Sequence, residues 1–157
     1  MEQIKSFTGI YAIFSNFTPI RIEFENMIYP SVEHAYVASK STNLTVRREI
    51  AILPANQAGK AKKMGRIVQL RSDWSKVNES FMEDFVRQKF KNPLFKEILL
   101  DTGDAEIIEG NYWHDNYWGD CLCKSCSDIS GENKLGKIIM KIREELLNEP
   151  TANPRSR

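Results

Sequence analysis

The sequence predicts an α+β fold: a single, mostly helical domain with a small antiparallel β-sheet. Its 157 residues, 41% of them hydrophobic and 27% charged, suit one globular domain with a sizeable core. Several stretches repeat apolar residues at helical spacing, and only one stretch alternates them as a half-buried strand does. We expect the domain to cover residues 1–148. Residues 149–157, with two prolines and no apolar periodicity, are expected to form a disordered tail.

The strand pattern lies at residues 20–24, where apolar and charged side chains alternate. Glu25-Asn26 is expected to turn the chain into a returning strand at residues 27–29, which gives a hairpin. Pro30 then ends the strand, and Ser31 is a suitable N-cap for a helix that carries residues 33–40.

The rest of the chain is expected to be helical, apart from one short strand and one long loop. Val77, Phe81 and Phe85 recur at helical spacing and indicate the longest helix. Residues 109–132 are rich in Gly, Asn, Asp and aromatic residues, and a loop of that length is typically functional or disordered. The expected elements are helices at 45–53, 54–65, 75–90, 93–103 and 133–147, and a strand at 105–108.

Composition excludes several classes of protein. The net charge of +1 provides no strong field for nucleic acid or an anionic membrane, and no run of 18 apolar residues exists to span a bilayer. The first residues lack the apolar core of a signal peptide. We therefore expect a cytoplasmic protein without membrane contact, and a monomer.

The most informative cluster is Glu33, Tyr36 and Lys40. Seven residues separate Glu33 from Lys40, about two helical turns, so both side chains fall on one helix face with Tyr36 between them. An acid, an aromatic ring and an amine on one stripe can hold and cleave a polar ligand. A solvated helix face would show the same spacing.

Three cysteines lie within residues 121–126, an odd and clustered count that does not suit a secreted disulfide framework. Cys121, Cys123, Cys126 and the upstream His114 match the ligand types of a tetrahedral zinc site. Structural zinc sites usually draw ligands from two separated knuckles, whereas all four residues here belong to one 13-residue loop. We therefore expect reduced thiols in a surface loop, and no metal.

Eight segments of the chain, in order, resemble the NADAR family, also called the YbiA-like family. Each segment alone is a weak signal, but eight in the family's order make a chance match improbable. They are FSNF (14–17), YPSVEHAYVASK (29–40), AKKMGR (61–66), RSDW (71–74), KF (89–90), LLDTGD (99–104), DNYWG (115–119) and GENKLGKIIMKIR (131–143).

The resemblance implies cleavage of N-glycosidic bonds in phosphoribosyl-type substrates. One branch of the family resembles glycohydrolases that remove ADP-ribose from guanine, in nucleotides or in DNA or RNA. Another resembles an N-glycosidase for early riboflavin-pathway intermediates. We expect the first activity, with the second as an alternative and a non-catalytic ADP-ribose or nucleotide binding module as a third. No cofactor is expected.

The resemblance also implies roles for three catalytic residues. Lys40 would be an amine nucleophile if a dry pocket or a neighbouring cation lowers its pKa. Glu33 would act as a general acid or base, or stabilise a cationic sugar. Asp115 would hydrogen-bond ribose hydroxyls or help proton transfer, although an Asp in a loop can equally form a turn.

The remaining site residues are expected to bind the substrate. Trp74 would stack on a base, or else anchor the long helix in the core. Arg66 would clamp a phosphate, or else is an ordinary exposed arginine. Asn133, at the start of the last helix, would either bind phosphate or cap that helix. His34 is expected in the core, and Gly136 requires close packing or a ligand beside it. The full set of expected binding residues is Phe14, Asn16, Phe17, Tyr36, Arg66, Trp74, Trp118 and Asn133.

Overall fold

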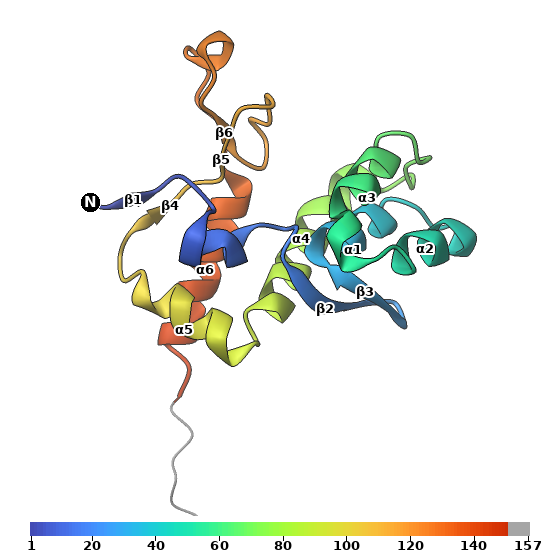
Figure 1. Ribbon diagram of the computed structural model, residues 1–157, viewed down its shortest axis with the longest axis horizontal. Coiled ribbons are helices and arrows are strands. Elements are labelled where there is room, and N and C mark those ends of the chain that lie inside the picture. The colour runs from blue at the N-terminus through green and yellow to red at the C-terminus, as the bar shows by residue number, and fades with distance from the viewer. Residues whose placement is uncertain (151–157) are drawn as a thin grey trace, which may run out of the picture. The chain divides into compact units, whose positions relative to one another are not determined.

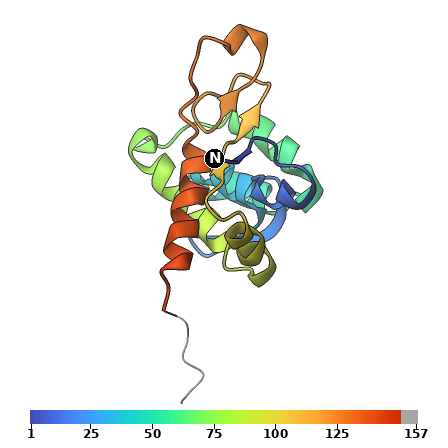
Figure 2. The same ribbon diagram turned by 90° about the vertical axis from the view of Figure 1, so that its left-hand side faces the viewer.

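The structure is a computed structural model, and it describes residues 1–150 (Figures 1 and 2). The chain divides into two compact units: a central unit, Ser6–Lys96, and a terminal unit, which joins Met1–Lys5 to the chain from Glu97 onward. The α+β class is confirmed. Most of the tail expected at 149–157 lies outside the described residues. Within residues 1–150, no helix is both long enough and apolar enough to cross a bilayer.

The predicted hairpin is present in the central unit. Strand β2 (Pro19–Phe24) pairs antiparallel with β3 (Met27–Ser31). The two turn residues, Glu25 and Asn26, have φ values of 44° and 66°, which is the left-handed pair that a two-residue hairpin turn requires. Phe24 is buried, so the alternation in the sequence marks the face that packs inward.

Helix α1 (Val32–Ser39) is the centre of this unit and packs against both strands. It also packs against α2 (Leu44–Ala51), α3 (Ala58–Gly65) and α4 (Trp74–Lys89). The hydroxyl of Ser31 accepts the His34 N–H at 3.2 Å and caps the helix, as predicted. Seven of the eight residues of α1 are buried, and Tyr36 is half-buried. The alternative of a solvated helix face is therefore wrong. His34 is fully buried, as expected of a core histidine.

The other predicted helices are present, with boundaries shifted by a few residues. The largest difference follows Pro54, which is extended, with ψ of 154°, and leads into a short 3₁₀ turn before the α-helix begins. Helix α5 runs from the central into the terminal unit. The remaining elements of this region are η1 (Gly9–Phe14), α2 (Leu44–Ala51), η2 (Ala55–Gln57), α3 (Ala58–Gly65), α4 (Trp74–Lys89) and α5 (Pro93–Asp101).

The terminal unit contains two strand pairs, and both are parallel. Strand β1 (Gln3–Ile4) pairs with β4 (Glu106–Ile107), and β5 (Gly110–Asn111) pairs with β6 (Asp120–Cys121). The strand expected at 105–108 is present as β4, but its partner β1 and the second pair were not predicted. Strands of two residues carry no periodicity that a sequence pattern could reveal. The expected small antiparallel sheet is thus only the β2–β3 hairpin.

Helix α6 (Lys134–Leu147) completes the terminal unit, as predicted. A Cβ on Gly136 would lie 2.1 Å from the Ile107 carbonyl oxygen, so close packing explains this glycine. Between β5 and α6 lie β6 and the short helix η3 (Lys124–Cys126). In both views this region extends past the amino-terminal end of α6 (Figures 1 and 2).

Candidate functional site

Lys40 directly follows α1, and its amine lies in a partly buried position. The Nζ atom donates to the Gly65 carbonyl at 3.2 Å and lies 5.4 Å from the centre of the Tyr36 ring. Burial is the main influence that lowers the pKa of Lys40; the nearby Lys62 lowers the pKa further, and the Glu33 carboxylate opposes both. A lowered pKa raises the fraction of neutral amine, the form that can act as a nucleophile.

Gly65 has no side chain, and this leaves space for the Lys40 amine beside it. A Cβ on Gly65 would lie 2.9 Å from the Val37 side chain and 3.3 Å from Lys40 Nζ. Any larger residue at the end of α3 would therefore crowd the amine. Gly65 and Lys62 both belong to the AKKMGR segment, but the sequence did not predict that either would lie near Lys40. Gly65 also lacks the left-handed conformation expected of a helix-ending glycine.

Glu33 lies in the first turn of α1 and is only 9% exposed. Its backbone N–H donates to the Asn16 carbonyl at 3.0 Å, which fixes the loop that carries Asn16 to the start of the helix. The side-chain nitrogen of Asn16 contacts Met82 Sδ at 3.6 Å. Its oxygen, Oδ1, is buried and has no hydrogen-bond partner among residues 1–150. A buried acceptor of this kind is suited to a donor on a ligand.

The two phenylalanines beside Asn16 have different environments. Phe14 is fully buried and packs against the rings of Phe7, Tyr11 and Phe90. Its assignment as a binding residue is corrected: it supports the loop from the core and has no surface to offer a ligand. Phe17 is 41% exposed, so its ring is accessible.

Lys89 supports the same loop from inside the protein. It is fully buried, and its Nζ donates to the Ser15 carbonyl at 2.9 Å. Burial lowers the pKa of Lys89 to about 7. Lys89 belongs to the KF segment of the family resemblance, but helical spacing does not reveal that a lysine is buried, so its role could not be predicted.

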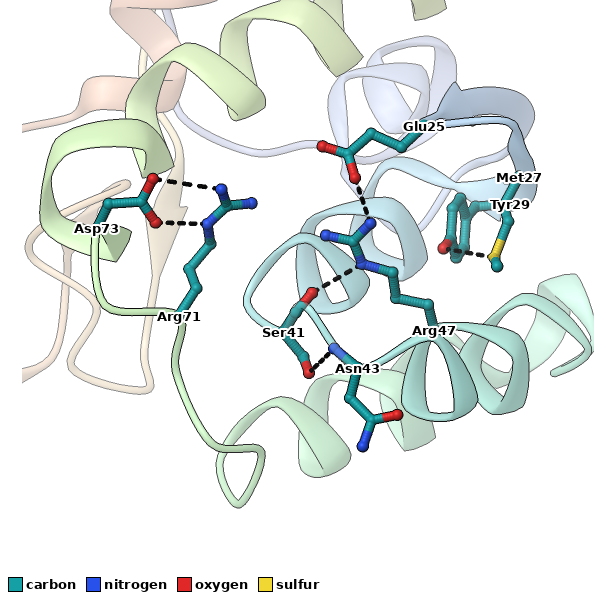
Figure 3. Close-up of polar contacts among 8 residues, drawn as sticks. All are labelled: Glu25, Met27, Tyr29, Ser41, Asn43, Arg47, Arg71 and Asp73. Atoms are coloured by element: carbon teal, nitrogen blue, oxygen red, sulfur yellow. Dashed lines mark hydrogen bonds and ion pairs between the residues drawn. The ribbon is translucent and has the colours of Figure 1, made fainter.

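Trp74 lies beside Tyr36, at the first position of α4. Their ring centres are 5.2 Å apart, and the planes are tilted by 51°. The backbone N–H of Arg71 donates to the Lys40 carbonyl at 2.7 Å and holds this segment to the end of α1. The Arg71 side chain forms an ion pair with Asp73, with a shortest contact of 2.6 Å (Figure 3). Trp74 is half-buried, a position compatible with both of its predicted roles.

Two arginines near this region differ in what they can bind. Arg66, next to Gly65, is exposed, which is compatible with both interpretations of this residue. Arg47 is buried, forms an ion pair with Glu25 and donates from Nε to the Ser41 carbonyl at 2.7 Å (Figure 3). Arg47 therefore stabilises the fold.

In the terminal unit, Asp115 organises the backbone around Trp118. Its Oδ1 accepts the N–H groups of Tyr117 at 3.1 Å and Trp118 at 2.9 Å, which is an Asx turn. The Trp118 carbonyl in turn accepts the Leu135 N–H at 2.9 Å. The turn-forming alternative for Asp115 is thus realised, whereas its catalytic role is still a prediction.

Asn133 precedes α6 in a left-handed conformation, with φ of 48°, and does not cap the helix with its side chain. Its amide instead donates to the Ile107 carbonyl and accepts the Glu109 N–H, both at 2.9 Å. Asn133 is also buried, so its amide serves the fold, and only the backbone at this helix start could meet a phosphate. Another group in this unit, His114 with the three cysteines, has the composition of a metal site.

The chain is similar in sequence and in structure to known proteins. A family model described as the NADAR domain matches residues 5–147. The N-glycosidase Npun_R5314 of Nostoc punctiforme is 36% identical over 145 residues, which cover 88% of this chain and 87% of that protein. The N-glycosidase YbiA of Escherichia coli is 31% identical over 140 residues, covering 88% and 84% of the two chains.

Two further matches add detail. The riboflavin biosynthesis protein VVA0006 of Vibrio vulnificus is 36% identical over 139 residues, but the match covers 87% of this chain and only 36% of that longer protein. The NMR structure of E. coli YbiA superposes with a TM-score of 0.78 at 29% identity, covering 98% of this chain and 93% of the other.

Proposed function

This chain belongs to the NADAR family and is an N-glycosidase, and we propose that it removes ADP-ribose from guanine, with Lys40 as its covalent catalyst. One observation carries the proposal: the Lys40 amine is partly buried, and burial lowers its pKa even though the Glu33 carboxylate of the preceding helix opposes the shift. A lowered pKa increases the fraction of neutral amine, which is the form that can act as a nucleophile.

The proposed reaction begins with attack of the neutral Lys40 amine on C1 of the ribose. The bond between C1 and the base nitrogen breaks, and the base leaves with the electron pair and takes up a proton. The ribose ring oxygen then leaves C1 and is protonated, which opens the ring and gives a Schiff base between C1 and Nζ. Water adds to C1, the C1–Nζ bond breaks, and the free sugar and the Lys40 amine are restored.

Glu33 is proposed as the group that moves these protons. Glu33 is only 9% exposed, and a carboxyl on a buried residue can have its pKa tuned for use as a general acid or base. Positively charged sugar intermediates would also be stabilised by its carboxylate. Asp115 is proposed to assist, through the ribose hydroxyls or the leaving base.

Substrate binding is proposed to use aromatic and cationic groups of the central unit. The Tyr36–Trp74 pair offers one stacking surface beside Lys40, and the exposed ring of Phe17 offers a second, 5.9 Å from Lys62 Nζ. ADP-ribose joined to guanine carries two bases and two phosphates. Two aromatic surfaces with cations nearby suit such a ligand better than one with a single base. ADP-ribosylated DNA or RNA would present the same groups.

The second candidate is an N-glycosidase for an early riboflavin-pathway intermediate. It is supported by the relatives that are named riboflavin biosynthesis proteins, in Vibrio vulnificus and in maize. The chemistry at C1 would be the same, and only the leaving base and the phosphate pattern would differ.

A direct assay separates the two substrates. Purified protein is incubated in parallel with ADP-ribosylated guanosine and with the phosphoribosyl riboflavin intermediate, and the released sugar is identified by chromatography. We expect free ADP-ribose from the first. Release of ribose 5-phosphate from the second alone would replace our substrate with the alternative, and no release from either would oppose the enzymatic proposal.

Trapping tests the covalent step. Borohydride added during turnover delivers hydride to C1 of the Schiff base and converts it to a stable secondary amine. Mass spectrometry should then find the sugar on the peptide that contains Lys40. The Lys63→Arg variant is a matched control, because Lys63 is an exposed lysine of the adjacent helix α3 and its loss should leave trapping unchanged.

A further inference from the structure

We propose that His114, Cys121, Cys123 and Cys126 form a mononuclear, structural zinc site in the terminal unit. One nitrogen of His114 and the three sulfur atoms all lie within 4.8 Å of one another. This site has no part in the proposed glycosidase chemistry, and it reverses our expectation of reduced thiols without a metal.

The distances fit tetrahedral coordination. His114 Nδ1 lies 3.3 Å from Cys126 Sγ, 3.4 Å from Cys123 Sγ and 4.0 Å from Cys121 Sγ. Zinc bonds of about 2.3 Å to sulfur and about 2.0 Å to nitrogen place tetrahedral N and S ligands about 3.6 Å apart. All three cysteines are free, so no disulfide competes for the sulfur atoms. Three thiolates and one imidazole are also a ligand set that prefers zinc.

Although the four residues lie within one short stretch of sequence, the fold places them on separate structural elements. Cys123 and Cys126 form a knuckle of their own, in which the Cys126 N–H donates to the Cys123 carbonyl at 3.1 Å. Cys121 comes from strand β6, and His114 comes from the turn that follows the partner strand β5. Pairing of β5 with β6 therefore brings together two sources of ligands that the sequence presents as a single run.

The 112–130 loop has no hydrophobic core of its own, and a bound metal would stabilise it instead. Its large apolar side chains are largely exposed: Tyr112 is 68% exposed, Trp113 56% and Ile129 51%. Buried within the loop are instead the two thiols of Cys121 and Cys126. Small structures that cannot bury enough apolar surface commonly depend on a metal for their stability.

The site would be closed, with four protein ligands and no position for a substrate, so its effect would be structural. His114 is a non-glycine residue with φ of 68°, a conformation that its surroundings must impose. Asp115 follows it immediately. Zinc would therefore hold the segment that carries Asp115 and Trp118.

Metal analysis of the purified protein gives the first test. Protein produced with zinc in the medium and kept reduced should carry one zinc per chain by elemental analysis and by native mass spectrometry. Replacement of the metal by Co²⁺ should give the intense visible bands of tetrahedral cobalt and thiolate charge-transfer absorption. A metal content at background, or iron in place of zinc, would overturn the proposal.

The cysteines themselves report on the site, because the chain has only three. A thiol reagent should react slowly with all three in the holoprotein and rapidly once a chelator has removed the metal. Equal rates with and without chelator would contradict the assignment. This measurement needs no variant and so does not depend on a mutant that folds.

Substitution gives the ligand identity. Cys126→Ser and His114→Ala should each lose tight binding of Co²⁺ and its thiolate bands, whereas Ser127→Ala, an exposed loop residue beside Cys126, should bind Co²⁺ as the natural protein does. Normal Co²⁺ spectra for Cys126→Ser would exclude that residue and with it the site.

Discussion

Lys40 and Asp115 are both proposed to act on the substrate, yet the chain holds them by different means. Lys40 follows a helix in which seven of eight residues are buried and which packs against five other elements. Asp115 lies in a loop with largely exposed aromatic residues, where its carboxylate holds two backbone N–H groups.

Because of this difference, effects on activity and on stability should be easier to separate at Lys40 than at Asp115. Removal of the Lys40 amine leaves the apolar packing of α1 intact, so activity should change without stability. Asp115 is part of what shapes its own loop, so a substitution there can disturb both.

Lys40→Arg should lower kcat by about 10³-fold or more, because arginine keeps the charge but offers no usable nucleophile. The natural enzyme should also gain activity as pH rises through the lowered pKa of Lys40, since the neutral amine is the reactive form. Steady-state kinetics and a thermal melt measure both properties.

The matched control is Lys63→Arg, which should keep full activity. Near-normal turnover by Lys40→Arg would end the covalent mechanism. A large loss of melting temperature would show that Lys40 also belongs to the structural part of α1, and the contrast with Asp115 would fail.

For Asp115, two substitutions separate catalysis from turn formation. Asp115→Asn keeps an oxygen that can accept the N–H groups of Tyr117 and Trp118, whereas Asp115→Ala keeps none. If Asp115 takes part in proton transfer, the Asp115→Asn variant should have a kcat lowered by roughly 10²-fold with little change in melting temperature. Full activity of Asp115→Asn together with lowered activity of Asp115→Ala would show that Asp115 only forms the turn.

The region around Lys40 and the region around Asp115 also differ in how well the sequence predicts them. Helix α1, its Ser31 cap and the hairpin before it are encoded by neighbouring residues, so periodicity and turn residues predict them. The site around Lys40 also required contacts from distant segments. The sequence indicated Trp74 through family resemblance, but not the close approach of Gly65, which only the packed α3 reveals.

The terminal unit was predicted less well for a physical reason. Its strands have two residues each, and β1 pairs with β4 across more than 100 residues of chain. Local patterns do not encode such pairing. Without β5 beside β6, the four side chains of the proposed metal site looked like one run of residues. Without Ile107 and Glu109 beside it, the amide of Asn133 looked like a helix cap.

Trp74 tests whether packing and binding can be separated within the helical region. Trp74→Phe keeps an aromatic face beside Tyr36 and should bind the substrate better than Trp74→Ala. Loss of stacking in Trp74→Ala should cost about 1–3 kcal/mol of binding free energy. Isothermal titration with a non-cleavable analogue gives the affinity, and denaturant unfolding gives the stability. Unchanged affinity with unfolding free energy lowered by about 3–5 kcal/mol would identify Trp74 as a core anchor.

The smallest expected effect concerns Lys89, the buried lysine beneath the loop of Ser15. Its pKa is about 7 in the folded protein against an ordinary value of 10.5. Between these two values the unfolded chain binds a proton that the folded chain lacks, so stability should rise with pH, by at most about 1.4 kcal/mol per pH unit. Below pH 7 both states are protonated and this contribution to the slope vanishes.

Lys89→Met removes the titrating amine and should flatten the dependence, while Lys91→Met, at an exposed position of the same region, should keep the natural slope. Urea unfolding of the three proteins at pH 7, 8 and 9 measures the difference, and groups common to all three, including the cysteines, cancel from the comparison. The upper limit of pH 9 also avoids Tyr29, whose pKa is raised by burial from 10. Parallel slopes for the natural protein and Lys89→Met would mean that Lys89 keeps its proton when buried, held as a cation by the Ser15 carbonyl.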